Sequence, residues 1–96
     1  MARFRSKPVE IEAFQLTAAI IAEALFGGAS LHPGVTFRGE ARPSERTYQG
    51  HFVCNSRQGN VPADVDDWII VEPGEASLCY PCKPDVFAAK YEAIDG

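Results

Sequence analysis

Residues 8–28 read PVEIEAFQLTAAIIAEALFGG, and the change of pattern within this stretch decides the fold. Its first half alternates apolar and acidic side chains in the order Val9, Glu10, Ile11, Glu12, Ala13. An alternation with a period of two predicts a half-buried strand over residues 8–16. After Thr17 the apolar residues follow helical spacing instead, so the stretch predicts a strand that leads directly into a helix.

The helix expected over residues 18–26 has both a start signal and a stop signal. The Thr17 hydroxyl is suited to accept a hydrogen bond from a free N–H of the first turn. Gly27 and Gly28 follow the helix, and glycine readily adopts the left-handed conformation that ends one. Glu23 falls on the outer side, so we expect this helix to lie on a sheet through its apolar side chains.

The remainder of the chain predicts short strands joined by tight turns, with a loop and a second helix. Further strands are expected over residues 35–38, 48–55, 61–65, 68–72, 76–80 and 91–94. Gly39 and Pro43 interrupt the chain early in this region, so residues 39–47 are interpreted as a mobile polar loop. A short C-terminal helix is expected over about residues 85–90. The pattern predicts an α+β fold, in which an antiparallel β-sheet of about five strands is covered by one main α-helix.

Size and composition indicate a single soluble domain over residues 1–96. Of the 96 residues, 46% are hydrophobic and 23% charged, as in ordinary globular domains. A net charge of −4 argues against binding to a nucleic-acid backbone. No apolar run approaches the roughly 18–20 residues of a membrane helix, and no apolar region follows the basic N-terminus as in a signal peptide. We therefore expect a cytoplasmic protein that binds neither nucleic acid nor membrane.

The charges are distributed unevenly along the chain. Residues 31–60 contain four arginines against two glutamates, whereas residues 61–96 contain two lysines against eight acidic residues. A basic middle and an acidic C-terminal third can attract each other between two copies of a chain. This asymmetry favours a homo-oligomer, and solvated surface charge with internal ion pairs is the alternative explanation.

Two blocks of the sequence resemble a family of small proteins from tailed bacteriophages and prophages. The first reads RSKPVEIEAFQ (residues 5–15), and the second combines DWII (residues 67–70) with YPCKPDVF (residues 80–87). Members of this PGDYG-like family open with a KPVxIEAFQ strand and close with GD(Y/W)II and YPCKPDIF motifs. The resemblance implies a phage or prophage origin, the cytoplasm of a bacterial host and a compact α+β fold, and it implies no reaction.

The sequence departs from that family at two positions. Where the family has Pro-Gly-Asp, this chain has Val65-Asp66-Asp67, so the turn must avoid a positive φ or Asp66 must tolerate one. The approach to Cys82 is also longer than in the family, so Cys79 is not supported as a family feature.

The cysteines suggest two kinds of site. The pairs His51-x-x-Cys54 and Cys79-x-x-Cys82 match the ligand spacing of a structural zinc site. His51 and Cys54 lie in a predicted strand, however, where residues three apart point to opposite faces. The segment from Cys79 to Cys82 also resembles a redox-active C-x-P-C motif. Small buried thiols that pack as apolar groups are the alternative, and we expect no metal or other cofactor.

A second set of candidate residues is basic. Its members are Arg38, Arg42, Arg46 and Lys83. A flexible loop rich in arginine can close on a phosphate-bearing ligand, because the guanidinium group binds phosphate through two hydrogen bonds. The alternative is a loop kept soluble by its charges, with Glu40 and Glu45 as internal partners.

No enzyme motif accompanies these residues. The sequence lacks a Gly-x-Ser-x-Gly nucleophile motif, a His-Glu-x-x-His zinc motif and a phosphate-binding glycine-rich loop. We therefore expect a non-enzymatic phage accessory protein that acts by binding, either to itself as a homo-oligomer or to a host or virion protein. The alternatives are a binder of a small anionic or nucleotide-like ligand through the arginines, and a zinc or redox mini-domain that uses Cys54, Cys79 and Cys82.

Overall fold

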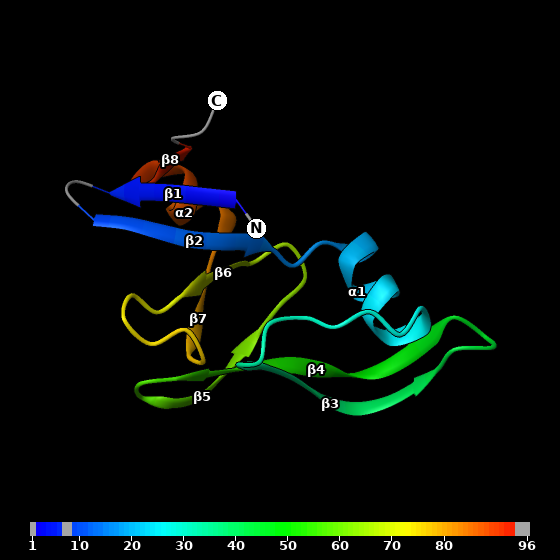
Figure 1. Cartoon of the computed structure of the whole chain (residues 1–96). Coiled ribbons are helices and arrows are strands. Elements are labelled where there is room, and N and C mark those ends of the chain that lie inside the picture. The colour runs from blue at the N-terminus through cyan, green and yellow to red at the C-terminus, as the bar shows by residue number, and fades with distance from the viewer. Residues whose placement is uncertain (1, 7–8, 94–96) are drawn as a thin grey trace.

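The computed structural model describes residues 2–6 and 9–93, which form strands and two helices (Figure 1). The elements are β1 (Ala2–Ser6), β2 (Val9–Gln15), α1 (Ala18–Phe26), β3 (Val35–Arg42), β4 (Thr47–Ser56), β5 (Gly59–Ala63), β6 (Trp68–Val71), β7 (Cys79–Cys82), α2 (Pro84–Lys90) and β8 (Glu92–Ala93). No helix formed by the described residues is long and apolar enough to cross a membrane. Pro8 and Ile94, which belong to predicted strands, lie outside the described residues.

The strands form two antiparallel sheets. One has five strands in the order β7-β6-β2-β1-β8, and the other has three strands in the order β3-β4-β5. The α+β class predicted from the sequence is confirmed. The prediction of one antiparallel sheet of about five strands is correct only in part: a five-stranded sheet is present, but β3, β4 and β5 form a second sheet and pair only among themselves within the described chain. Figure 1 shows this second sheet below β6 and β7, with α1 beside it.

The stretch from β2 to α1 has the local structure that its sequence indicates. The side chains of Ile11 and Ala13 are buried, as the alternation in β2 requires. The predicted limits of α1 are correct, and the Thr17 hydroxyl accepts a hydrogen bond of 3.2 Å from the N–H of Ile20. Gly28, with a φ of 76°, provides the left-handed residue after the helix.

The segment predicted as a mobile polar loop is instead half of a long hairpin. β3 continues through Gly39 to Arg42 and β4 begins at Thr47, so the loop is reduced to the turn over residues 43–46. Gly39 does not interrupt the strand because it lies directly opposite Gly50 of β4. Pro43 stands at the start of the turn, where its missing N–H removes no ladder hydrogen bond.

Several predicted boundaries also change. The strand expected over residues 76–80 lies at residues 79–82, because turns occupy residues 73–74 and 76–77. β1 was not predicted, and it pairs with both β2 and β8. The second helix begins with Pro84, one residue before the predicted start.

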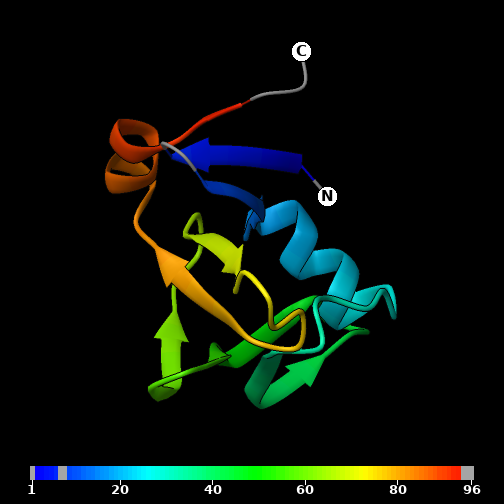
Figure 2. The same cartoon turned by 60° about the vertical axis from the view of Figure 1, so that its left-hand side comes forward.

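The five-stranded sheet is buried on both faces at β6. Ile69 and Ile70 are neighbours in β6, so their side chains point to opposite sides, and each is at most 1% exposed. Ile69 packs with α1 and the three-stranded sheet, whereas Ile70 packs with Phe87 of α2. Figure 2 shows α2 and the three-stranded sheet on opposite sides of β6. This arrangement explains why β6 reads as the apolar run WIIV rather than as an alternation.

The three-stranded sheet and α1 belong to the segment between β2 and β6. This segment starts and ends at the same place beside the five-stranded sheet. The N–H of Leu16 donates to the carbonyl of Asp67 at 2.8 Å. The N–H of Asp66 in turn donates to the carbonyl of Leu16, also at 2.8 Å. Residues 17–65 therefore form a loop whose two ends are hydrogen-bonded to each other.

Candidate interaction surface

The two blocks that carry the family resemblance meet in the core beneath α2. The rings of Trp68 and Phe87 are stacked with centroids 4.2 Å apart and planes 3° apart. Phe4 packs edge-on against both rings at 5.1 and 4.9 Å, and Tyr91 lies 5.0 Å from Phe87. Aromatic contacts of this kind stabilise a fold and need no ligand. These aromatic residues therefore pack together as part of the core.

Lys83 joins the two parts of the second block through an ion pair with the buried carboxylate of Asp67. Its Nζ lies 2.7 Å from Oδ2 of Asp64 and 3.1 Å from Oδ1 of Asp67. Asp67 is only 3% exposed, and its other oxygen accepts the N–H of Asp64 at 2.9 Å. Lys83 thus ties the start of β6 to the start of α2 and compensates a buried charge. Asp66 between the two acids has a φ of 73°, so it tolerates the positive φ at the position where the family has glycine.

The ion pairs of Lys83 with Asp64 and Asp67 predict that the stability of the protein depends measurably on pH. The hydrogen bond and charge of Lys83 hold the pKa of Asp64 below its ordinary value of 3.8, and the same contact raises the pKa of Lys83 above 10.5. The Asp64 contribution to stability is present above pH 3.8 and is lost as the pH falls through the lowered pKa. The Lys83 contribution is present below pH 10.5 and is lost as the pH rises through the raised pKa.

We expect Lys83→Met to raise the pKa of Asp64 towards 3.8, measured by NMR titration of the carboxyl carbon. The charged partner that favours the ionised carboxylate is then absent. Lys90→Met removes one positive charge elsewhere on α2 and should leave the Asp64 pKa unchanged. An Asp64 pKa that responds equally to both substitutions would contradict this role of Lys83.

Two of the three cysteines form a buried thiol pair between the sheets. Cys54 of β4 and Cys79 of β7 are both 0% exposed. Interaction with the Cys79 thiol raises the pKa of Cys54 far above its ordinary value, and the same interaction lowers that of Cys79. The backbone N–H of Asn55 also contributes to the lowered pKa of Cys79. Both side chains pack among apolar residues and act as part of the core.

The remaining cysteine and His51 lie apart from this pair. His51 is exposed while Cys54 is buried, which is the separation onto opposite faces expected for a strand. Cys79 and Cys82 stand at the two ends of β7, so the C-x-P-C segment is extended and does not begin a helix. Among the described residues, no three potential ligands of the types His, Cys, Asp and Glu gather around one point.

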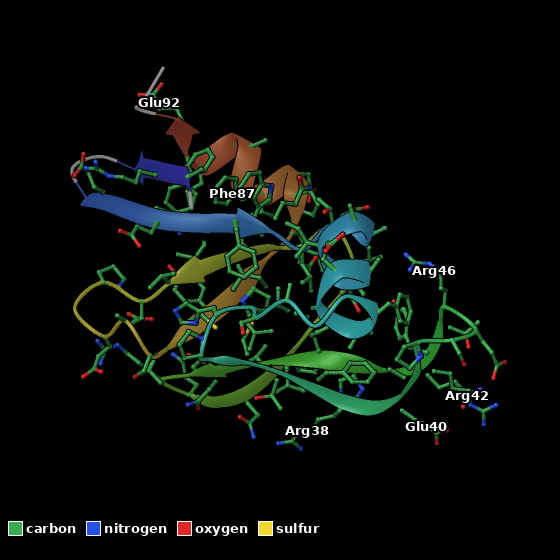
Figure 3. The ribbon with its side chains drawn as sticks, turned by 45° about the vertical axis from the view of Figure 1, so that its right-hand side comes forward. Arg38, Glu40, Arg42, Arg46, Phe87 and Glu92 are labelled. Atoms are coloured by element: carbon green, nitrogen blue, oxygen red, sulfur yellow. The ribbon has the colours of Figure 1, made fainter. Side chains whose placement is uncertain are left out.

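The basic residues are also separated by the structure. Arg42 pairs with Glu40 at 3.2 Å and with Glu45 at 3.8 Å, and the Arg46 guanidinium lies 5.2 Å from the Phe26 ring centre. Figure 3 shows Arg38 and Arg42 pointing away from the body of the protein, whereas Arg46 points to the side of α1. Because Lys83 belongs to the carboxylate cluster, the four basic side chains do not converge on one anion site.

Helix α1 is apolar on nearly all sides, and most of its apolar side chains are only partly buried. Eight of its nine residues are apolar, and Ile21 is the one that is fully buried. A helix that is apolar on all sides is typical of a buried position. The helix has more apolar residues than a helix buried along one side needs. This excess is visible in the sequence and indicates an interface, but the search for motifs missed it.

An open apolar groove of about 610 Å³ lies beside α1. Phe14, Ala19 and Ile20 line one part of it, and Leu31 and Pro33 from the segment before β3 line another. The carboxylate of Glu23 also lines this groove. The groove and the exposed face of α1 form one continuous surface, which we call the α1 surface, defined by the exposed side of residues 18–26 together with residues 29–33.

The edges of the two sheets differ in how well they are protected. Edge strands β5 and β7 each contain a proline, Pro62 and Pro81, and the described part of β8 is only two residues long. Prolines and short strands both prevent pairing with another chain. Of the four sheet edges in the described part of the chain, β3 is the one that is long and free of proline.

Comparison of this chain with family models, curated proteins and solved structures finds no match.

Proposed function

We propose that this chain is a non-catalytic accessory protein of a phage or prophage that acts by binding, and that its partner is a second copy of itself. The α1 surface carries this proposal, because eight of the nine residues of α1 are apolar but only Ile21 is fully buried. Phage origin is supported by the resemblance of residues 5–15, 67–70 and 80–87. A non-catalytic role is supported by the structural use of the motif residues in packing and ion pairing.

The groove of the α1 surface is largely apolar. Burial of apolar surface contributes about 25 cal/mol per Å², so covering the groove favours association. Contiguous exposed apolar surface rimmed by polar groups marks interaction sites in soluble proteins. A second copy is favoured over an unrelated partner because α1 packs beside β3, the unprotected sheet edge, and both features can be covered together.

A charged residue placed in the groove tests the proposal. We expect Ala19→Glu to raise the Kd of self-association at least about tenfold, since a carboxylate buried at an apolar interface is strongly unfavourable. Sedimentation velocity and native mass spectrometry measure the subunit count and the Kd. Ala88→Glu is the matched control, because Ala88 is exposed on α2, outside the α1 surface.

Three results would decide against the proposal. A wild-type chain that is monomeric at every concentration, or an equal response to both substitutions, would overturn self-association through this surface. A host or virion protein bound to a monomeric chain, with binding lost in Ala19→Glu, would assign the α1 surface to a different partner.

A further inference from the structure

We propose that two copies of the chain pair edge to edge through β3, antiparallel, with Gly39 of one copy opposite Gly39 of the other. The two three-stranded sheets then form one continuous six-stranded sheet across a two-fold axis. This inference rests on the proposed self-association and specifies the contact through which it occurs.

The backbone of β3 has free hydrogen-bonding groups in the required places. The N–H of Asn55 donates to the carbonyl of Gly34 at 2.7 Å, whereas the N–H of Val35 donates to His32 at 2.9 Å, away from β4. The β3–β4 register is regular, so this alternation continues along the strand. Phe37, Gly39 and Ala41 therefore direct their N–H and C=O groups towards the free edge.

A two-fold axis at Gly39 pairs these groups fully. Gly39 lies opposite its counterpart, and Phe37 lies opposite Ala41 of the second copy on both sides of the axis. Each of these pairs exchanges two N–H···O bonds in an antiparallel ladder. A shift of the axis to Ala41 would place Gly39 opposite the second copy's Pro43, which has no N–H to donate.

Charge complementarity selects the same register. Thr36, Arg38, Glu40 and Arg42 share the exposed face of β3. With the axis at Gly39, Arg38 lies opposite the second copy's Glu40, and this pair occurs twice. An axis at Glu40 instead places Glu40 opposite Glu40 and Arg38 opposite Arg42, whereas an axis at Arg38 places the two Arg38 side chains together. Like charges directly opposite destabilise a strand pair.

The same axis brings the two α1 surfaces onto one side of the joined sheet. Phe37 lies on the face of β3 that packs with α1, as its contact with Tyr48 and the contact of Tyr48 with Phe26 show. A two-fold axis perpendicular to a sheet places the same face of both copies on the same side of the joined sheet. The helix α1 of each copy therefore lies above the six-stranded sheet near the axis, where the groove beside it faces the other copy.

Two opposite charge changes test this register. Arg38→Glu alone makes the facing pairs acid against acid, and Glu40→Arg alone makes them base against base. We expect each variant alone to have a Kd of self-association at least about tenfold above wild type. An equimolar mixture of the two variants should form a heterodimer with nearly the wild-type Kd, because every facing pair is then complementary. Native mass spectrometry distinguishes the heterodimer from both homodimers.

The mixture also serves as the folding control, because only folded variants can associate again. Lys90→Glu on α2 makes the same change of net charge as Arg38→Glu and should leave the Kd unchanged. A wild-type dimer that neither variant weakens would overturn the β3 contact while the proposed function stands. A wild-type chain that never associates would overturn both, and variants that weaken association without recovery on mixing would exclude the Gly39 register.

Discussion

Phe87→Ala is expected to lower the free energy of unfolding by about 3–5 kcal/mol, the largest effect of any single truncation near the C-terminus. Phe87 is 3% exposed and its ring contacts those of Trp68, Phe4 and Tyr91. Its loss leaves a cavity at the point where α2, β1 and β6 meet. A chain of 96 residues has a total stability of about 5–14 kcal/mol, so this change removes a large part of it.

Urea denaturation followed by far-UV circular dichroism measures the effect. Fluorescence is unsuitable as the only probe, because Trp68 stacks on the ring that is removed. Val86→Ala is the matched control on the same helix, since Val86 is 51% exposed and should change stability by no more than about 0.5 kcal/mol. A loss of less than about 1.5 kcal/mol in Phe87→Ala would show that α2 is not an integral part of the core.

Gly39→Ala is expected to destabilise the protein by about 3 kcal/mol through the hairpin. A Cβ atom at position 39 would lie 2.1 Å from the carbonyl oxygen of Gln49 and 2.6 Å from the Cα of Gly50. Both are backbone atoms of the neighbouring strand, so β3 and β4 would have to separate locally. The φ of 153° at Gly39 adds strain for any residue with a side chain.

Gly28→Ala isolates the conformational part of this effect. Gly28 has a φ of 76°, but a Cβ there would meet no atom within 4 Å. We expect a loss of about 1 kcal/mol for this variant, from backbone strain alone. Equal losses in the two variants would mean that the close approach of Gly39 and Gly50 contributes nothing, and thermal unfolding of both proteins settles the comparison.

The order of local elements was predictable where one face of an element is buried. The alternation before Thr17 and the helical spacing after it reflect burial on a single side, and the capping residues set the limits of α1. The position of β6 was predictable for a different reason, because an apolar run of four residues suits a strand buried on both faces.

The division into two sheets was not visible in the sequence, because strand pairing depends on partners far apart in the chain. β1 has one inward aromatic residue, Phe4, between arginines, and its stability comes from pairing with β2 and β8. Gly39 was interpreted as a breaker because its partner, Gly50, becomes apparent only when the two strands are aligned. Local propensity therefore described the elements and missed their assembly.

The grouping of the candidate functional residues was limited for the same reason, because it too depends on contacts between residues far apart in the chain. Lys83 belongs to a buried carboxylate cluster with Asp67, sixteen residues away, so its grouping with three arginines had no spatial basis. The spacing of His51 and Cys54 matched a zinc pattern, although the strand alternation already predicted their separation. The surface that supports binding was marked instead by the apolar excess of α1, which no motif describes.

The hydrogen bonds between Leu16 and residues 66–67 have a consequence for how such a chain can evolve. Because the segment 17–65 starts and finishes at the same junction, its length can vary while the five-stranded frame stays closed. A replacement segment must shield Ile69 and Cys79, which would otherwise be exposed on the inner face of that frame. Substitutions within residues 17–65 can therefore change the α1 surface and β3 while the junction at Leu16 holds the five-stranded frame closed.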